Sequence, residues 1–86
     1  MKVTISDHAK GRASKWGISE EGIRRVLSKS PAVSVPSKTD PEAIVVFGKY
    51  EAKTWGVVLN VNTLNVITVR PASKKERRFY EQKTGN

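Results

Sequence analysis

The second half of the chain contains three apolar segments rich in β-branched and aromatic residues, and both gaps between them are of hairpin length. The segments cover residues 44–48, 54–61 and 65–69, and the gaps cover residues 49–53 and 62–65. Side chains of this kind favour the pleated, half-buried surface of a sheet, and short gaps favour antiparallel neighbours. The pattern therefore predicts a three-stranded antiparallel meander, which restricts the chain to folds built around a sheet.

Strand and helix signals also stand at the start of the chain. Residues 2–5 alternate in polarity as a short strand does. Ser6 is a suitable N-cap for a helix over residues 7–16, and Gly17 predicts the C-terminal stop of that helix.

A second helix is predicted over residues 19–29. Ser19 is its expected cap, and Glu20 and Glu21 lie where the positive end of the helix dipole favours carboxylates. Pro31 predicts the end of the helix. The helix has an apolar stripe at the spacing i, i+3, i+4, made of Ile23, Val26 and Leu27.

The last predicted helix, over residues 74–82, follows a capping box in which Ser73 precedes Glu76 by three positions. Residues 34–43, which include two prolines, predict a loop. The element order β-α-α-β-β-β-α predicts an α+β fold: a small antiparallel sheet, made of the meander and the short N-terminal strand, with the helices on one face. We expect a single domain over residues 1–86.

The charge of the chain is strongly unbalanced. Sixteen lysines and arginines stand against eight aspartates and glutamates, which gives a formal net charge of +8. Residues 1–30 carry seven cations and three anions, residues 31–69 carry three of each, and residues 70–86 carry six cations and two anions. Such an imbalance favours a polyanionic partner, and a fold that brings the two ends together would concentrate it.

Several kinds of site are missing from the sequence. With no cysteine and one histidine, the chain offers neither a disulfide framework nor a metal-ligand cluster. We therefore expect no metal and no cofactor. No run of about 18 apolar residues and no apolar signal-peptide core occurs, so we expect a cytoplasmic protein without a membrane partner.

The segment from Arg70 to Tyr80 (RPASKKERRFY) holds five cations, one carboxylate and one phenol. Glu76 and Tyr80 are four residues apart and share one helical face, while Arg70 ends the preceding strand. The same residues also have purely structural explanations. Glu76 would be a capping carboxylate, Tyr80 a half-buried ring, and the cations part of a solvated basic helix. His8 is likewise either a surface or capping residue or an acid–base group, and Trp16 is either a core residue or a stacking surface for a base.

Residues 68–81 resemble the C-terminal motif of the BrnT family of type II toxins, within the RelE-like ribonuclease superfamily. The segment 14–31 is similar to an N-terminal segment of that family, and residues 7–19 are similar to a His-Ala…Arg pattern of related small domains. Trp16 stands where the family has a histidine, and Pro71 stands where a long polar residue is usual. The positions that keep the spacing of the C-terminal motif are Arg70, Ala72, Glu76, Arg77 and Tyr80.

The resemblance implies a compact RelE-like domain that cleaves RNA and is neutralised by an acidic antitoxin, which usually also binds DNA. RNA can be cut without a metal when its own 2′-OH attacks the adjacent phosphorus. Arg70 and Arg77 would then stabilise the charge on phosphorus. Glu76 is the candidate base, Tyr80 the candidate for the leaving-group proton or for substrate positioning, and His8 the remaining acid–base candidate. The predicted RNA-binding residues are Lys10, Arg12, Lys74, Lys75 and Arg78.

Two other hypotheses fit the same residues. Besides a ribonuclease toxin, the residues fit a catalytically silent nucleic-acid-binding module. They also fit an interaction protein whose charge serves an acidic protein partner. Silent binding predicts an affinity for RNA that falls linearly with salt on logarithmic axes, without cleavage. The third hypothesis predicts weak RNA binding and a tight protein complex. Both a dimer and a toxin–antitoxin hetero-oligomer stay open as assemblies.

Overall fold

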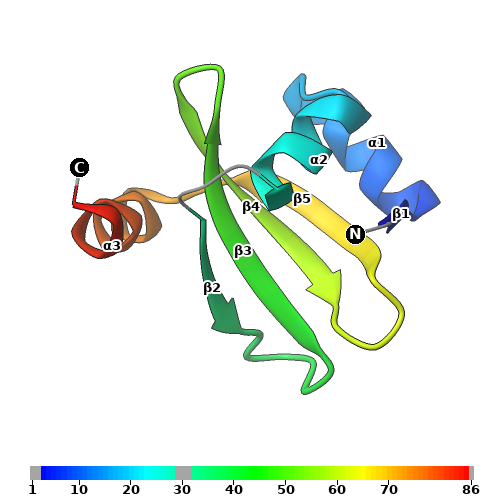
Figure 1. Cartoon of the computed structure of the whole chain (residues 1–86). Helices are drawn as coiled ribbons and strands as arrows, with labels where there is room; N and C mark the ends of the chain where they lie inside the picture. Colours follow the sequence, from blue (N-terminus) through cyan, green and yellow to red (C-terminus); the bar gives the residue numbers. More distant parts are fainter. Residues whose placement is uncertain (1–2, 29–31, 86) are drawn as a thin grey trace.

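The computed structural model describes residues 3–28 and 32–85, in which three helices and five strands form an α+β fold (Figure 1). The helices are α1 (Asp7–Trp16), α2 (Glu20–Ser28) and α3 (Lys74–Thr84). The strands are β1 (Thr4–Ile5), β2 (Val33–Pro36), β3 (Ala43–Tyr50), β4 (Lys53–Asn60) and β5 (Asn65–Pro71). No described helix is long and apolar enough to cross a membrane.

The predicted meander is confirmed, and it lies at the centre of a larger sheet. The strand order is β1-β5-β4-β3-β2, with β1 parallel to β5 and the other neighbours antiparallel. The prediction of a purely antiparallel sheet was therefore wrong. The chain passes through α1 and α2 between β1 and the rest of the sheet, so β1 can reach the outer edge of β5 in the parallel sense.

A fifth strand was missed by the sequence analysis. Residues 33–36 form β2 and pair with β3, although residues 34–43 were predicted as a loop. Val33 and Val35 supply the alternating apolar side chains that a strand needs. Pro36 misled the prediction, because a proline is tolerated on an edge strand, where one side of the backbone has no ladder partner.

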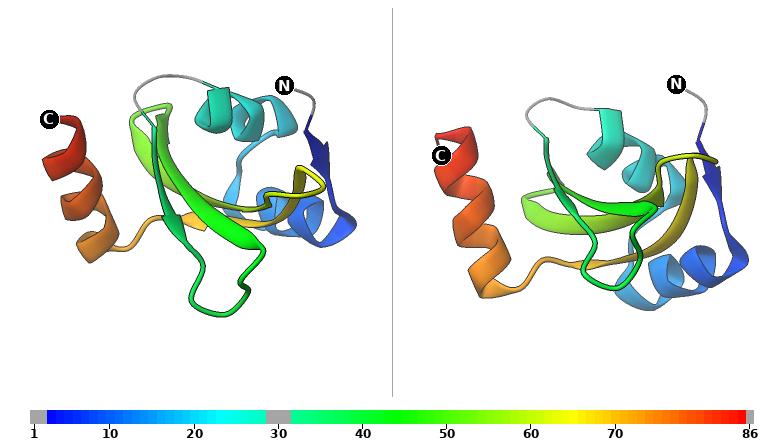
Figure 2. Two further views of the ribbon diagram at one scale, coloured as in Figure 1. Left: turned by 60° about the horizontal axis from the view of Figure 1, so that its bottom comes forward. Right: turned by 90° about the horizontal axis from the view of Figure 1, so that it is seen from below.

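The helices cover both faces of the sheet, so the prediction of helices on one face was wrong. α1 and α2 pack on the first face, while α3 lies apart from them and packs on the second (Figure 2). Both faces of β3 are apolar, and this explains the difference. Gly48 turns toward α2, where a Cβ would come within 2.9 Å of the Val26 carbonyl oxygen, and Phe47 turns toward Tyr80 of α3.

A β-bulge decides which residues of β5 face each side. Val58 pairs with Thr68 and Leu59 pairs with Val66, so Ile67 is the extra residue. Val66 consequently lies in the core of the first face with α1 and α2. Beyond the bulge, Thr68 and the residue two positions later, Arg70, fall on the second face.

The predicted caps are confirmed. The Ser6 hydroxyl accepts the Ala9 N–H at 3.1 Å, and Gly17 ends α1 with a φ of 79°. The Ser19 hydroxyl accepts the Gly22 N–H at 3.0 Å at the start of α2. The predicted stop of that helix at Pro31 lies outside the described residues.

The conformation of the hairpin turn between β3 and β4 leads to a prediction about stability. Only two residues connect the strands, and both have positive φ, 52° at Glu51 and 66° at Ala52. Side chains with a Cβ are disfavoured in this conformation, whereas Asn-Gly suits such two-residue turns. The double variant Glu51→Asn, Ala52→Gly should raise the free energy of unfolding by about 1 kcal/mol. Urea denaturation with an unchanged m-value measures this, and a lower midpoint would contradict it.

Candidate functional site

A bidentate ion pair joins the end of β5 to the start of α3. Arg70 donates from Nη1 to Oε1 of Glu76 at 2.5 Å and from Nη2 to Oε2 at 2.8 Å. The same carboxylate accepts the Ser73 N–H at 2.9 Å, and the Ser73 hydroxyl accepts the Glu76 N–H at 3.2 Å. Glu76 therefore completes the predicted capping box and also fixes the plane of the Arg70 guanidinium.

These contacts determine the charge of the pair. The hydrogen bonds from Arg70 are the main cause that lowers the pKa of Glu76 to about 2, against an ordinary value of 4.5, and the Ser73 N–H adds to it. Its hydrogen bond with Glu76 likewise raises the pKa of Arg70. A general base works best with a pKa near the working pH. The geometry thus favours an orienting role for Glu76 over the predicted role of base.

Three side chains of α1 form a stripe beside Arg70. His8, Arg12 and Trp16 are spaced by four residues, and with Thr68, Val69 and Arg70 they line a depression of about 380 Å³. Trp16 is 42% exposed, and the Lys15 ammonium lies 5.2 Å from its ring centroid. We call the depression lined by these six residues the α1–β5 depression.

Two features hold α1 against β5. Ala9 and Ala13 are buried on its inner face, and their small side chains allow the helix a close approach to the sheet. The Ser6 hydroxyl, besides capping α1, donates to the Ile67 carbonyl at 3.2 Å. The outer stripe is in consequence held beside the C-terminal end of β5.

Arg70 also borders a second depression, on the second face of the sheet. This one has a volume of about 510 Å³, and we call it the sheet groove. Its apolar floor includes Val45 and Val58, and its walls include Lys38 and Glu76. Thr68 and Arg70 line both depressions, so the two are neighbours at the C-terminal half of β5.

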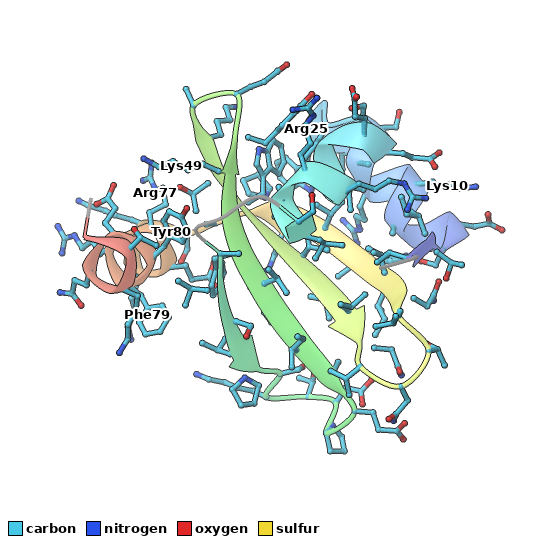
Figure 3. The ribbon with its side chains drawn as sticks, in the orientation of Figure 1. Lys10, Arg25, Lys49, Arg77, Phe79 and Tyr80 are labelled. Atoms are coloured by element: carbon cyan, nitrogen blue, oxygen red, sulfur yellow. The ribbon has the colours of Figure 1, made fainter. Side chains whose placement is uncertain are left out.

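The structure separates the other predicted catalytic residues from Arg70. Arg77 lines a different depression, with Lys49 and Lys53, and Figure 3 shows Arg77 and Lys49 on the same side of α3. Tyr80 is 1% exposed and packs with Phe47 in the core of the second face. Of the group expected around one concavity, Arg70 and Glu76 are in contact, and catalytic roles for Arg77 and Tyr80 stay predictions.

The predicted RNA-binding residues are exposed but scattered. Arg12 lies in the α1–β5 depression, whereas Lys10 borders another hollow with Glu20 and Arg24. The remaining three project from α3 into solvent, and they are Lys74, Lys75 and Arg78.

Three members of the α1–β5 depression, Trp16, Thr68 and Val69, were not assigned to the site from the sequence. Trp16 was interpreted as either a core residue or a stacking surface for a base and was left out of the candidate site, although its spacing of four residues from Arg12 and eight from His8 was a signal that it shares their face. Thr68 carried no signal, because its direction depends on the bulge at Ile67. Among the described residues, no group of three or more His, Cys, Asp or Glu side chains could hold a metal ion.

Comparison of the chain with protein-family models, with curated proteins and with solved structures finds no match. The resemblance of the motif residues to the BrnT family therefore stays a prediction.

The ion pair predicts how stability changes with pH. Glu76→Gln keeps an N3 side chain that suits a capping box but removes the charge that faces Arg70. The free energy of unfolding at pH 7 should fall by about 1–2 kcal/mol, a figure already reduced for the partial exposure of the pair. The folded state holds the carboxylate ionised more strongly than the unfolded chain does. The contribution of the pair is therefore complete above a pH of about 4.5 and is lost as the pH falls to about 2.

Urea denaturation of the wild type and of Glu76→Gln across this pH range measures the effect. The two stability curves should converge near pH 2. A difference that stays constant down to that pH would show that the substitution acts through packing or capping rather than through the ion pair.

Proposed function

We propose that this protein binds single-stranded RNA over the α1–β5 depression and cleaves it without a metal, as the toxin of a toxin–antitoxin pair with a RelE-like fold. One observation carries the proposal: a histidine, two arginines and an exposed tryptophan, which are His8, Arg12, Arg70 and Trp16, line a single open depression. These groups supply what a protein needs to hold an RNA backbone, stack a base and move a proton.

Two arginines bind the reacting phosphate in this mechanism. Arg12 and Arg70 come from different elements and border the same depression, so their guanidiniums can contact different phosphate oxygens. Glu76 holds Arg70 in a fixed orientation before RNA binds. A donor that is already oriented stabilises the charge that develops on phosphorus at little reorganisation cost.

The RNA supplies its own nucleophile. The 2′-OH attacks the adjacent phosphorus, the bond to the 5′-oxygen breaks, and a 2′,3′-cyclic phosphate and a free 5′-OH result. One proton leaves the 2′-OH and one is given to the 5′-oxygen. His8 carries one of these transfers and solvent carries the other, because Glu76 is held ionised by Arg70 and Tyr80 is buried.

Trp16 serves as a stacking surface. Its ring is exposed at the end of the His8–Arg12 stripe, and a base next to the bound phosphate can lie against it. Stacking of this kind contributes about 1–3 kcal/mol per base and tolerates any base. The toxin role and the antitoxin partner are supported by the motif residues that resemble the BrnT family and by the net charge of +8, which suits an acidic partner.

A second candidate function is a catalytically silent RNA-binding module. The observation that favours it is the single acid–base group in the α1–β5 depression, His8, whereas cleavage moves two protons. Both candidates use the same surface for binding, so only a measurement of cleavage separates them.

His8→Ala tests the catalytic proposal. His8 is exposed, so the variant should fold, and loss of one proton transfer should slow single-turnover cleavage of RNA by about 100- to 10,000-fold. RNA affinity should change little, because the arginines remain. The matched control is Arg25→Ala, which removes an exposed cation of α2 (Figure 3) and should cleave at the wild-type rate. Wild-type protein that binds RNA and leaves it intact would establish the silent module instead.

The toxin role makes a prediction in cells. Induced expression of the wild type in a bacterial host should arrest growth, and co-expression of the antitoxin encoded beside it should restore growth. His8→Ala, at an equal soluble level, should permit normal growth. Normal growth with soluble wild-type protein would contradict the toxin role. The cleavage assay would then still test whether the protein cuts RNA.

A further inference from the structure

One cross-strand row on the second face of the sheet is only partly covered. Val35 pairs with Val45, Val45 with Val58, and Val58 with Thr68, so four strands contribute one side chain each. Val35, Val58 and Thr68 are half-buried, whereas Phe47 in the adjacent row is covered by Tyr80 of α3. The open row forms the floor of the sheet groove.

The open row ends beside the proposed phosphate site. Thr68 belongs to the row and also lines the α1–β5 depression, as Arg70 does. Gly56 leaves room for the Arg70 side chain over the sheet: a Cβ at that position would lie 3.2 Å from the Phe47 ring and 3.6 Å from Nη1 of Arg70. The guanidinium therefore lies close above the second face of the sheet, where Arg70 lines the sheet groove.

The chemistry of the sheet groove fits a nucleobase better than an acidic peptide. Its walls carry two cations, Lys38 and Arg70, and two carboxylates, Asp40 and Glu76, so an anionic chain gains no net attraction there. A nucleobase is neutral and flat, and a floor of valines gives it apolar contact. The volume of about 510 Å³ lies within the range of ordinary ligand pockets, about 300–1,000 Å³.

We infer that the sheet groove receives the base next to the phosphate held by Arg12 and Arg70, on the side away from Trp16. This inference rests on the proposed RNA binding and extends it to a two-base footprint, with one base on the indole and the next on the valine row. A base that lies flat on a sheet cannot remain paired in a duplex. The substrate is accordingly single-stranded RNA, and duplex RNA of the same sequence binds weakly.

Val58→Phe tests the inference by filling the floor of the groove. The probe is a fluorescently labelled adenylate hexamer, with binding measured by anisotropy over a series of salt concentrations. Affinity should fall about tenfold, at the low end of the contribution of one stacked base, while the salt slope stays at the wild-type value because the phosphate contacts remain. An abasic hexamer of equal charge should bind Val58→Phe and the wild type equally.

The control is Val61→Phe, the same substitution at a 46%-exposed valine that lines a hollow on the first face. It should bind the adenylate hexamer as the wild type does. Val35→Phe, on the edge strand β2, is the second groove variant if Val58→Phe does not fold, and the same tenfold loss is expected of it.

Three outcomes would overturn the inference. The first is that folded groove variants bind RNA as tightly as the wild type, while Arg12→Ala still weakens RNA binding. The proposed function would then remain. The second is a groove substitution that weakens binding of a glutamate hexapeptide and not of RNA, which makes the groove a peptide site. The third is a wild type that binds no RNA, which removes the proposed function as well.

Discussion

The paired hydrogen bonds between Arg70 and Glu76 connect the last strand to the last helix and orient the one arginine that borders both depressions. The carboxylate has a second duty in the cap of α3, so the position of the helix and the direction of the guanidinium are set by one side chain. An arginine tied in this way offers its remaining N–H groups in a fixed direction. The use of one side chain for two roles suits a chain of 86 residues, in which few elements are available to support a site.

Much of the fold was predictable because local signals and the final structure agree. The caps at Ser6, Ser19 and Ser73 and the stop at Gly17 were read correctly from single residues and their spacing. The edge strand β2 was not, because Pro36 signals a loop in any local window, and only the partner β3 makes it a strand. α3 packs on the second face because both faces of β3 are apolar. Periodicity alone does not predict which of two apolar faces a helix covers.

The site was less predictable than the fold, for a related reason. The sequence grouped Arg70, Glu76, Arg77 and Tyr80 because they are close along the chain. In the structure Arg77 and Tyr80 turn to other sides of α3. Besides its contact with Glu76, Arg70 shares a depression with residues of α1, some sixty residues earlier. The two basic ends of the chain do meet, as the charge distribution suggested, but through Arg12 and Arg70 rather than through the lysine-rich helix.

The bulge at Ile67 interrupts the alternation by which successive side chains of β5 face opposite sides of the sheet. With strict alternation from Val66 onward, Thr68 and Arg70 would turn toward α1 and α2, and Val69 would turn away from them. The number of residues in this strand therefore carries information that no single side chain carries. The position of a length change in β5 therefore matters: loss of Ile67 would remove the bulge and keep Thr68 and Arg70 on the second face, whereas loss of Val69 would turn Arg70 toward α1 and α2.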